Sequence, residues 1–162
     1  MLYLRHSELD QIDLNILQAL QENGRISNLE LASRINLSPP ATHTRVKKLE
    51  DQGFIRQYVA LLDRDKLGYD LVCFLNVSIL LRNLDDLNII RRALIELPEV
   101  LECYHVTGQA DFILKVVVRG HTELEHFITE KLLPIRNIAS TNTSIVLAEF
   151  KSTTALPLQA SE

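Results

Sequence analysis

The sequence predicts an α+β protein in two parts, a three-helix unit followed by a ferredoxin-like βαββαβ unit. Over the first sixty residues, apolar side chains recur at three- and four-residue intervals, which is typical of amphipathic helices. After a turn segment at residues 63–70 (DRDKLGYD) the pattern changes to short runs rich in β-branched residues, separated by two helical stretches. We therefore expect one domain over residues 1–60 and a second over residues 61–162.

The composition is that of an ordinary globular protein, with 162 residues, 46% of them hydrophobic and 23% charged. No apolar run approaches the roughly 20 residues that span a bilayer, and the first ten residues lack the apolar stretch of a signal peptide. We therefore expect a cytoplasmic protein without a membrane partner. Cys73 and Cys103 lie in apolar stretches without metal-ligand spacing. This favours buried, reduced thiols, with no disulfide, no metal and no cofactor.

The net charge of −4 excludes a diffuse polycation that would coat nucleic acid. Residues 1–60 hold seven basic and seven acidic side chains, whereas the remainder holds ten and fourteen. The acidic excess thus lies in the second domain, and any DNA contact must come from a local cluster in the first.

Caps and helical spacing define the first two helices. Ser7 or Asp10 begins a helix that runs through Asn23. Ser27, with Glu30 three residues later, forms a capping box for the second helix. The apolar residues that the second helix contributes to a three-helix core are Leu29, Leu31, Ala32 and Ile35.

A turn at residues 36–37 separates the second helix from a third. Ser38 caps this third helix, and Pro39 occupies its first position, where the amide lacks an intrahelical partner anyway. The helix runs to about Gln52, with Gly53 as its stop. Two helices joined by so short a turn predict a helix-turn-helix, whose second helix enters the major groove of double-stranded DNA.

The third helix carries a polar, basic face that suits DNA. The early part of such a helix meets base edges, and other polar side chains reach phosphates. The alternative is a solvated polar face without a ligand. The residues predicted to bind DNA are Ser38, Pro39, Thr42, His43, Thr44, Arg45, Lys47 and Lys48.

Within the third helix we expect a division between core and DNA. The side chains expected to face the core are Ala41, Val46 and Leu49. Those expected at base edges are Thr42, His43 and Lys47, with Thr44 and Lys48 near phosphates. Arg45 has two alternative roles, a DNA contact or an ion pair with an acidic residue of the first helix such as Asp13.

Six further segments predict the second domain. The expected strands are residues 71–81, 100–107, 112–118 and 143–151, with helices starting at Asn83 or Asp85 and at Thr122. Residues 54–62 (FIRQYVALL) predict a linking strand before them. The order βαββαβ places both helices on one face of the sheet. A second copy would cover the other face, so we expect a homodimer, which also matches palindromic DNA half-sites.

Four segments of the sequence resemble the Lrp/AsnC family of leucine-responsive and asparagine-synthase (feast/famine) regulators. They are LDQIDLNILQALQENGRIS, LSPPATHTRVKKLEDQGFI, LPEVLECYHVTGQADFILKV and STNTSIVL, within a resemblance that covers residues 8–152. The resemblance implies a winged helix-turn-helix joined by a strand to a ferredoxin-like (RAM-type) effector domain. It also implies dimers that assemble into octamers, and transcription control tuned by a small molecule, usually an amino acid.

The family's Gly-x-x-Asp effector loop matches Gly108 and Asp111. Glycine permits a tight turn whose amides hold a carboxylate, and the acid pairs with an ammonium group. The alternative is an ordinary β-turn that Asp111 stabilises locally, with His105 a half-buried sheet histidine. The effector-binding residues that the resemblance implies are His105, Thr107, Gly108, Gln109, Ala110, Asp111, Thr141 and Thr143. Gln109-Ala110 replaces bulkier residues of the family, which favours leucine or methionine as the effector.

Two other functions compete with an effector-controlled regulator. Sirohaem decarboxylases share this architecture and use pocket His and Arg residues, and the chain has five histidines. However, the sequence contains no nucleophile motif, phosphate loop or metal-ligand spacing, so we expect no catalytic residues and no enzyme. The second alternative is an effector-independent DNA-binding protein whose sheet domain serves only to oligomerise.

Overall fold

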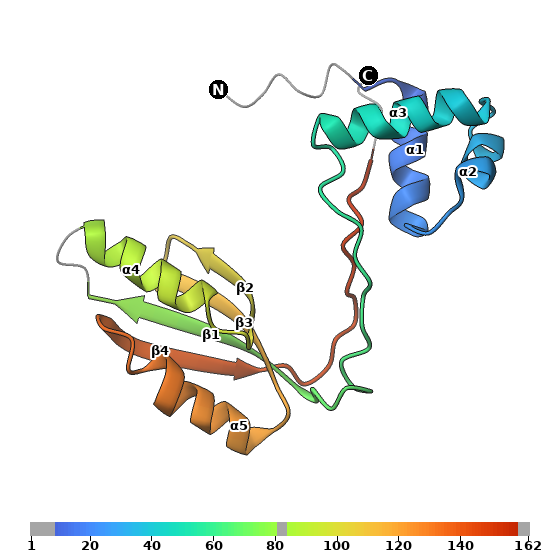
Figure 1. Cartoon of the computed structure of the whole chain (residues 1–162). Coiled ribbons are helices and arrows are strands. Elements are labelled where there is room, and N and C mark those ends of the chain that lie inside the picture. Colours follow the sequence, from blue (N-terminus) through green and yellow to red (C-terminus); the bar gives the residue numbers. More distant parts are fainter. Residues whose placement is uncertain (1–8, 81–83, 159–162) are drawn as a thin grey trace. The chain divides into compact units, whose positions relative to one another are not determined.

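The computed structural model describes residues 9–80 and 84–158, which form two compact units (Figure 1). One unit comprises the residues up to Leu61 together with the C-terminal segment from Lys151. The other spans Leu62–Phe150. The C-terminal segment, which was expected in the second domain, thus joins the first unit.

Three capped helices form the first unit: α1 (Gln11–Glu22), α2 (Asn28–Arg34) and α3 (Pro39–Asp51). Their N-caps are Asp10, Ser27 and Ser38, whose side chains accept hydrogen bonds from amides of the first turn. Capping boxes close the starts of α1 and α2, which satisfies amides that a helix leaves unpaired. The predicted helices and the Ser27 capping box are confirmed, and Ser7, the alternative cap of α1, lies outside the described residues.

A Schellman motif makes the turn between α2 and α3. The Leu37 amide donates to the Ala32 carbonyl at 3.0 Å, and the Asn36 amide donates to the Ser33 carbonyl at 3.4 Å. Asn36 has a φ of 56°, a left-handed conformation that asparagine tolerates better than most other side chains. The residue pair Asn36-Leu37 therefore encodes the turn that sets the start of α3.

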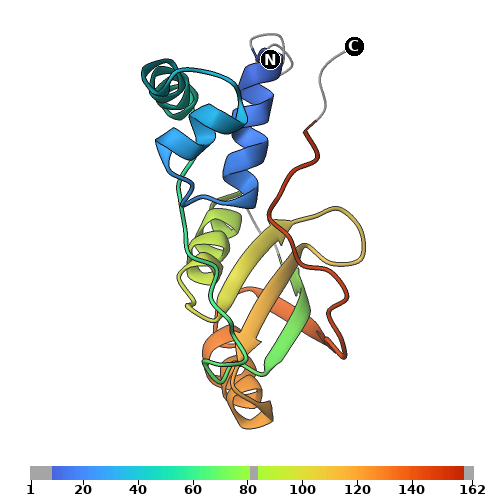
Figure 2. The same ribbon diagram turned by 90° about the vertical axis from the view of Figure 1, so that its right-hand side faces the viewer.

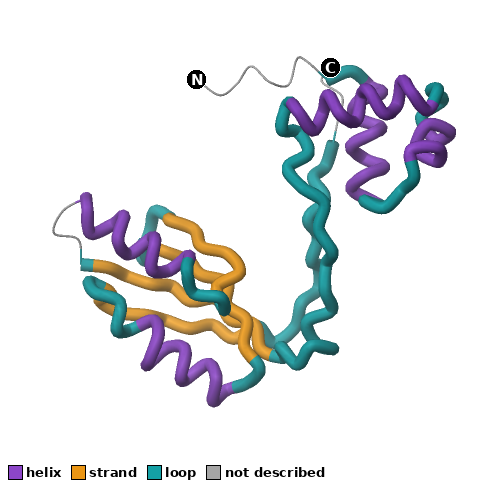
Figure 3. The backbone as a smooth tube through the Cα atoms, in the orientation of Figure 1, coloured by secondary structure: helices purple, strands orange, loops and turns teal. Residues whose placement is uncertain are grey.

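The helices enclose a small core whose buried members are Ile16, Ala19, Leu31, Ile35 and Leu49. Leu29, which was expected to join this core, is exposed instead. Residues 54–62 form loop rather than the predicted strand, as Figure 3 shows, so that prediction was wrong for the single chain. A strand needs a neighbouring strand to satisfy its amides and carbonyls, and these residues pair with none in the described part of the chain.

The second unit is a four-stranded antiparallel sheet of order β2-β3-β1-β4. Its strands are β1 (Leu71–Ile79), β2 (Val100–His105), β3 (Phe112–Val118) and β4 (Ile138–Ile145). Its helices are α4 (Leu84–Ile95) and α5 (His121–His126), the latter continued by a π-helical turn, η2 (Phe127–Leu132). The predicted βαββαβ order is confirmed. Asn83, an alternative start of α4, lies outside the described residues.

The last strand differs from its prediction at both ends, since it begins at Ile138 and stops at Ile145. Its sequence, IASTNTSI, is rich in residues that favour turns. Pairing along β1, from Ile79 opposite Ile138 to Cys73 opposite Ile145, overrides that preference.

Both helices of the second unit cover one face of the sheet, as the rotated view in Figure 2 shows. Side chains from α4, α5 and η2 share one buried cluster with alternate residues of the strands, namely Cys73, Leu75, Val77, Ile90, Leu94, Phe112, Leu114, Val116, Val118, Leu124, Phe127 and Leu132. The opposite face, which we call the outer face, exposes Phe74 and Tyr104. A face with exposed aromatic side chains is typical of an interaction surface.

Both cysteines are free thiols; Cys73 is buried and Cys103 is half-buried. Burial raises the pKa of both thiols. Among residues 9–80 and 84–158, no helix has both the length and the apolar character needed to cross a membrane.

Candidate nucleic-acid interface and effector site

Helix α3 presents its basic side chains to solvent. His43, Thr44, Lys47 and Lys48 are all exposed. In the described part of the chain neither lysine forms an ion pair with a carboxylate. The Thr44 hydroxyl donates to the Pro40 carbonyl at 3.0 Å. Two exposed lysines at consecutive positions of the chain's third helix, Lys47 and Lys48, suit the phosphate backbone of a duplex.

The start of α3 is fixed by hydrogen bonds within the protein. The Ser38 hydroxyl accepts from the Ala41 amide at 3.4 Å, as an N-cap should. The side-chain amide of Asn28, at the start of α2, donates to the Pro39 carbonyl at 2.9 Å. Of these two predicted DNA contacts, Ser38 therefore caps α3, and the Pro39 carbonyl holds the N-terminal end of α3 against α2.

Thr42 faces the core, which corrects the prediction that it contacts a base edge. Its side chain is 0% exposed, and its hydroxyl donates to the Ser38 carbonyl at 3.1 Å. Ala41, which was expected in the core, is exposed. The reason is helical geometry: residues 42, 46 and 49 follow one another at intervals of four and three, so they share a face, and Ala41 lies off it. A threonine thus completes the apolar face of α3.

Arg45 forms an ion-pair cluster with α1. Its Nη1 lies 2.8 Å from Asp10 Oδ2 and 2.7 Å from Asp13 Oδ1. The Asp13 side chain is only 4% exposed, whereas that of Asp10 is 50% exposed. A backbone hydrogen bond from Asp13, together with Arg45, lowers the pKa of Asp10, and hydrogen bonds to Asp13 and Asp10 raise the pKa of Arg45. Of the two alternatives for Arg45, the structure shows the ion pair with Asp13.

Asp10, the second partner of Arg45, was not predicted from the sequence. Asp10 and Asp13 stand three residues apart, a spacing that accounts for the capping box at the start of α1. Arg45 lies 32 residues beyond Asp13, and no local pattern connects them. Only the packing of α3 on α1 brings these three charges together.

The expected effector residues gather at one end of the sheet. His105 pairs with Phe112, Phe112 with Val77, and Val77 with Thr141, so one residue of each strand lies on the same row. The loop from residue 106 to 111 connects the first two strands of this row. The sheet therefore brings the Gly108–Asp111 loop and Thr141 to the same end of the domain, with Thr143 two residues further along β4.

The Gly108–Asp111 loop is held by Asp111. The Val106 amide donates to the Asp111 carbonyl at 3.0 Å, and the Asp111 amide donates to the Val77 carbonyl at 3.0 Å. One carboxylate oxygen of Asp111 also accepts from the Ile79 amide at 2.8 Å. Gly108 has a φ of 131°, which side chains other than hydrogen rarely permit. Asp111 therefore has a structural role in the loop, and Thr107, Gly108 and Gln109 stay exposed.

Thr141 carries the clearest sign of a missing partner at this end of the sheet. Its Oγ1 is buried, and in the described part of the chain it has no hydrogen-bond partner. A buried hydroxyl without a partner costs about 1–3 kcal/mol. A ligand or a second copy of the chain that supplied a hydrogen bond would recover this loss.

The row is too wide for one amino acid to contact both of its ends. Adjacent strands lie about 4.8 Å apart, so the backbones of His105 and Thr141 are separated by roughly 14 Å. The His105 ring stacks on Phe112 instead, with ring centroids 5.0 Å apart. The expected effector residues thus share one end of the sheet, with His105 and Thr141 on its two opposite edge strands.

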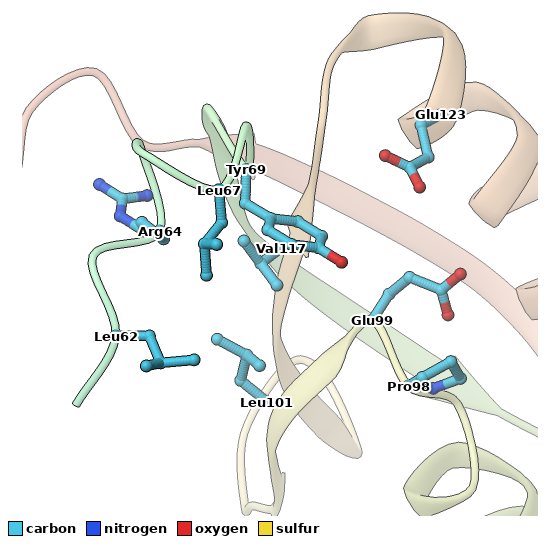
Figure 4. A pocket seen from close by; sticks show the side chains of 9 residues that line it. All are labelled: Leu62, Arg64, Leu67, Tyr69, Pro98, Glu99, Leu101, Val117 and Glu123. Atoms are coloured by element: carbon cyan, nitrogen blue, oxygen red, sulfur yellow. The ribbon is translucent and has the colours of Figure 1, made fainter. Parts of the chain in front are cut away.

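A cavity of about 320 Å³ lies at the other end of β2 and β3 (Figure 4). Its walls are mostly apolar, with Glu99 and Glu123 on one side; Glu99 is paired with Lys131 of η2. None of the expected effector residues lines it. In the described part of the chain, Glu99 Oε2 in the cavity wall is buried without a hydrogen-bond partner, as is Thr141 Oγ1 at the opposite end of the sheet. The cavity therefore lies apart from the expected effector residues.

Two family descriptions match the chain, one for each unit. Residues 9–56 match the winged helix-turn-helix DNA-binding family, and residues 72–156 match the Lrp/AsnC ligand-binding domain. The chain belongs to the Lrp/AsnC family. Its predicted fold class, a winged helix-turn-helix followed by a ferredoxin-like effector domain, is confirmed by this match and by the sheet topology.

Lrp/AsnC relatives match over nearly the whole chain. The leucine-responsive regulatory protein of Rhizobium meliloti is 38% identical over 89% of this chain and 92% of its own length. The Bkd operon transcriptional regulator of Pseudomonas aeruginosa is 35% identical over 94% and 99%. This member of the Lrp/AsnC family is thus a DNA-binding transcriptional regulator, and its relatives are named as regulators rather than enzymes.

Solved structures of Lrp/AsnC regulators share the fold. A Neisseria meningitidis transcriptional regulator, crystallised as a complex with L-Met, is 40% identical, with a TM-score of 0.88 over 92% of this chain and 96% of its own. AsnC of E. coli is 34% identical, with a TM-score of 0.84 over 92% and 99%. The order of helices and strands described above is therefore shared with these Lrp/AsnC regulators of known structure.

Proposed function

We propose that this Lrp/AsnC regulator inserts α3 into the major groove of cytoplasmic double-stranded DNA. His43 and Lys47 contact base edges, and Thr44 and Lys48 contact phosphates. The observation that carries this assignment is the exposed, unpaired basic face of α3, opposite the buried Thr42 and Leu49. Ser38 and Pro39 fix the start of the helix, and Arg45 fixes its packing on α1.

The outer face of the sheet supports a homodimer. Exposed Phe74 and Tyr104 lie on this face, and a second copy would bury them. A two-fold dimer presents two copies of α3, which matches a palindromic pair of half-sites. We expect these dimers to assemble further into octamers, as the resemblance to the family implies.

The effector of this regulator is an amino acid, leucine or methionine. In this proposal the backbone amides of the exposed Gly108 and Gln109 bind the effector's carboxylate, and the Asp111 oxygen that does not accept from the Ile79 amide binds its ammonium group. The complex of the Neisseria meningitidis relative with L-Met supports this ligand class. Since the row from His105 to Thr141 is too wide for one ligand, the site is completed by a second copy of the chain. The effector then favours one assembly over another and so changes DNA binding.

Selection of bound DNA from a random pool, with and without each amino acid, tests both parts of the proposal. We expect an enriched palindrome whose recovery changes with leucine or methionine. Lys47→Ala should weaken binding, whereas Lys66→Ala, a control at an exposed lysine of the second unit, should not. A pool that stays random at moderate salt would refute sequence-specific binding, and the absence of any bound DNA at low salt would refute DNA binding altogether. Enrichment that no amino acid changes would support the alternative, an effector-independent regulator.

A further inference from the structure

The C-terminal segment docks on α1 through its own backbone. The Leu156 amide donates to Gln21 Oε1 at 2.7 Å, and Gln21 Nε2 donates to the Leu156 carbonyl at 3.1 Å. One side-chain amide thus satisfies both main-chain polar groups of a residue 135 positions away in the sequence. Glutamine suits this role because its amide is a donor and an acceptor at once.

The polar side chains next to Gln21 on α1 have other hydrogen-bond partners, so they do not compete with the C-terminal segment for Gln21. Gln18 Nε2 donates to Glu22 Oε1 at 2.9 Å, and Glu22 Oε2 lies 2.5 Å from Arg34 Nη2. The polar groups on either side of Gln21 are therefore engaged within the three-helix unit. Both polar atoms of Gln21 bind the C-terminal segment instead.

The docked segment is restrained locally but held weakly. The Ala155 amide donates to Thr153 Oγ1 at 3.1 Å, and Pro157 has a fixed φ, so residues on both sides of Leu156 are stiffened. Stiffening lowers the entropy that docking costs. The Leu156 side chain remains 68% exposed, so the dock rests on two hydrogen bonds rather than on buried apolar surface. Such a dock opens and closes readily.

Docking gives the DNA-binding unit a second connection to the effector domain. Residues 146–155, ten in number, lie between the end of β4 and Leu156. The other connection, residues 52–70 between α3 and β1, has nineteen. Because β4 also carries Thr141 and Thr143, the shorter path along the chain from the effector residues to α1 runs through the C-terminal segment.

We propose that the C-terminal segment is a reversible second tether of the DNA-binding unit, docked on Gln21, and that its release weakens binding to paired half-sites. The effect on DNA rests on the proposed function. A DNA-binding unit that is tethered at two points loses less conformational entropy when both units of a dimer bind paired half-sites. Once the first unit is bound, a shorter tether also raises the effective concentration of the second unit at its half-site.

Hydrogen exchange of the full chain tests the dock itself. Gln21→Glu keeps the shape of the side chain but places an acceptor opposite the Leu156 carbonyl. We expect the Leu156 amide, which the dock protects, to exchange roughly tenfold faster than in the unaltered protein, while the amides of α1 keep their protection. Gln11→Glu is the control, since it makes the same change of charge on α1 at an exposed residue whose partner is Asn15.

Binding to DNA tests the tether, with the palindrome selected above and a single half-site as probes. Gln21→Glu should lower the affinity for the palindrome roughly tenfold and leave that for the half-site unchanged. The proposal would be overturned if the Leu156 amide exchanged equally fast in Gln21→Glu and in the control Gln11→Glu. It would also be overturned if exchange were faster in Gln21→Glu but the affinity for the palindrome stayed the same. Failure of the unaltered protein to bind any DNA would refute the proposed function, while the exchange comparison would still decide whether the segment docks.

Discussion

Removal of the Arg45 side chain distinguishes its structural role from a DNA contact. Arg45→Ala breaks both ion pairs of the cluster and leaves Asp13, which is 4% exposed, without its positive partner. The helix itself tolerates alanine, which has the highest helix propensity. A loss of stability would therefore come from the ion pairs and from the packing of the arginine stem.

The size of this loss follows from the exposure of the three side chains. Stranding one member of a buried ion pair costs about 3–5 kcal/mol, whereas an exposed pair contributes about 0–1 kcal/mol. Asp10 is half exposed, so its pair with Arg45 belongs to the second class. Arg45 is itself 32% exposed, and water would reach Asp13 in its absence. We therefore expect Arg45→Ala to lower the free energy of unfolding by about 2–3 kcal/mol.

Urea denaturation, followed by the helical circular dichroism of the full chain, measures this change, and hydrogen exchange of the amides in α1 and α3 localises it. Lys48→Ala is the matched control, because it removes an exposed basic residue of the same helix. We expect Lys48→Ala to change the free energy of unfolding by less than about 0.5 kcal/mol and to weaken DNA binding. The reasoning fails if Arg45→Ala behaves like Lys48→Ala, with weaker DNA binding at unchanged stability, because Arg45 would then be a DNA contact.

Four other changes test separate parts of the structure. Asn36→Val places a β-branched residue at a φ of 56° and should destabilise the first unit by about 1–2 kcal/mol or more in urea denaturation, whereas Asn36→Gly should not. Lys47→Ala should weaken binding and relax the sequence preference if the lysine reads a base, or reduce the salt dependence by about one unit of slope if it neutralises a phosphate; no change in either quantity would remove Lys47 from the interface. Asp111→Ala should abolish the heat of leucine or methionine binding in calorimetry, and full retention of that heat would limit Asp111 to its bond with the Ile79 amide. The pKa of Asp10 is lowered in the folded state, so its contribution to stability is present above its ordinary pKa of about 3.9 and is lost as the pH falls through the folded value. The free energy of unfolding should therefore fall less steeply below about pH 4 in Asp10→Asn than in the unaltered protein, and parallel pH curves for the two proteins would contradict this.

Local patterns in the sequence determined the helices of the first unit. Ser27 and Glu30 stand at capping-box spacing, and Ser38 precedes Pro39 at the start of α3. These signals involve residues a few positions apart, whose interactions form within one turn of helix. The same holds for β3, whose run of mostly apolar, β-branched residues predicted its bounds as found.

Tertiary structure decided which face of α3 meets the core, where β4 lies, and what holds the C-terminal segment. Thr42 is polar by itself, but its hydroxyl is satisfied by the Ser38 carbonyl, so burial costs little. β4 is a strand because β1 lies beside it, and residues 54–62 are loop because no strand among the described residues pairs with them. The effector residues Thr141 and His105 share a row only through the pairing of four strands.

Arg45 shows most clearly what local sequence predicts and what tertiary structure decides. It is ion-paired with α1, whereas Lys47 and Lys48 on the same helix are exposed. The sequence by itself supplied the helix, its caps and its charges, because these depend on neighbours along the chain. It left Arg45 with two roles, because the carboxylate that selects between them is 32 residues distant and reaches the guanidinium only when α3 packs on α1.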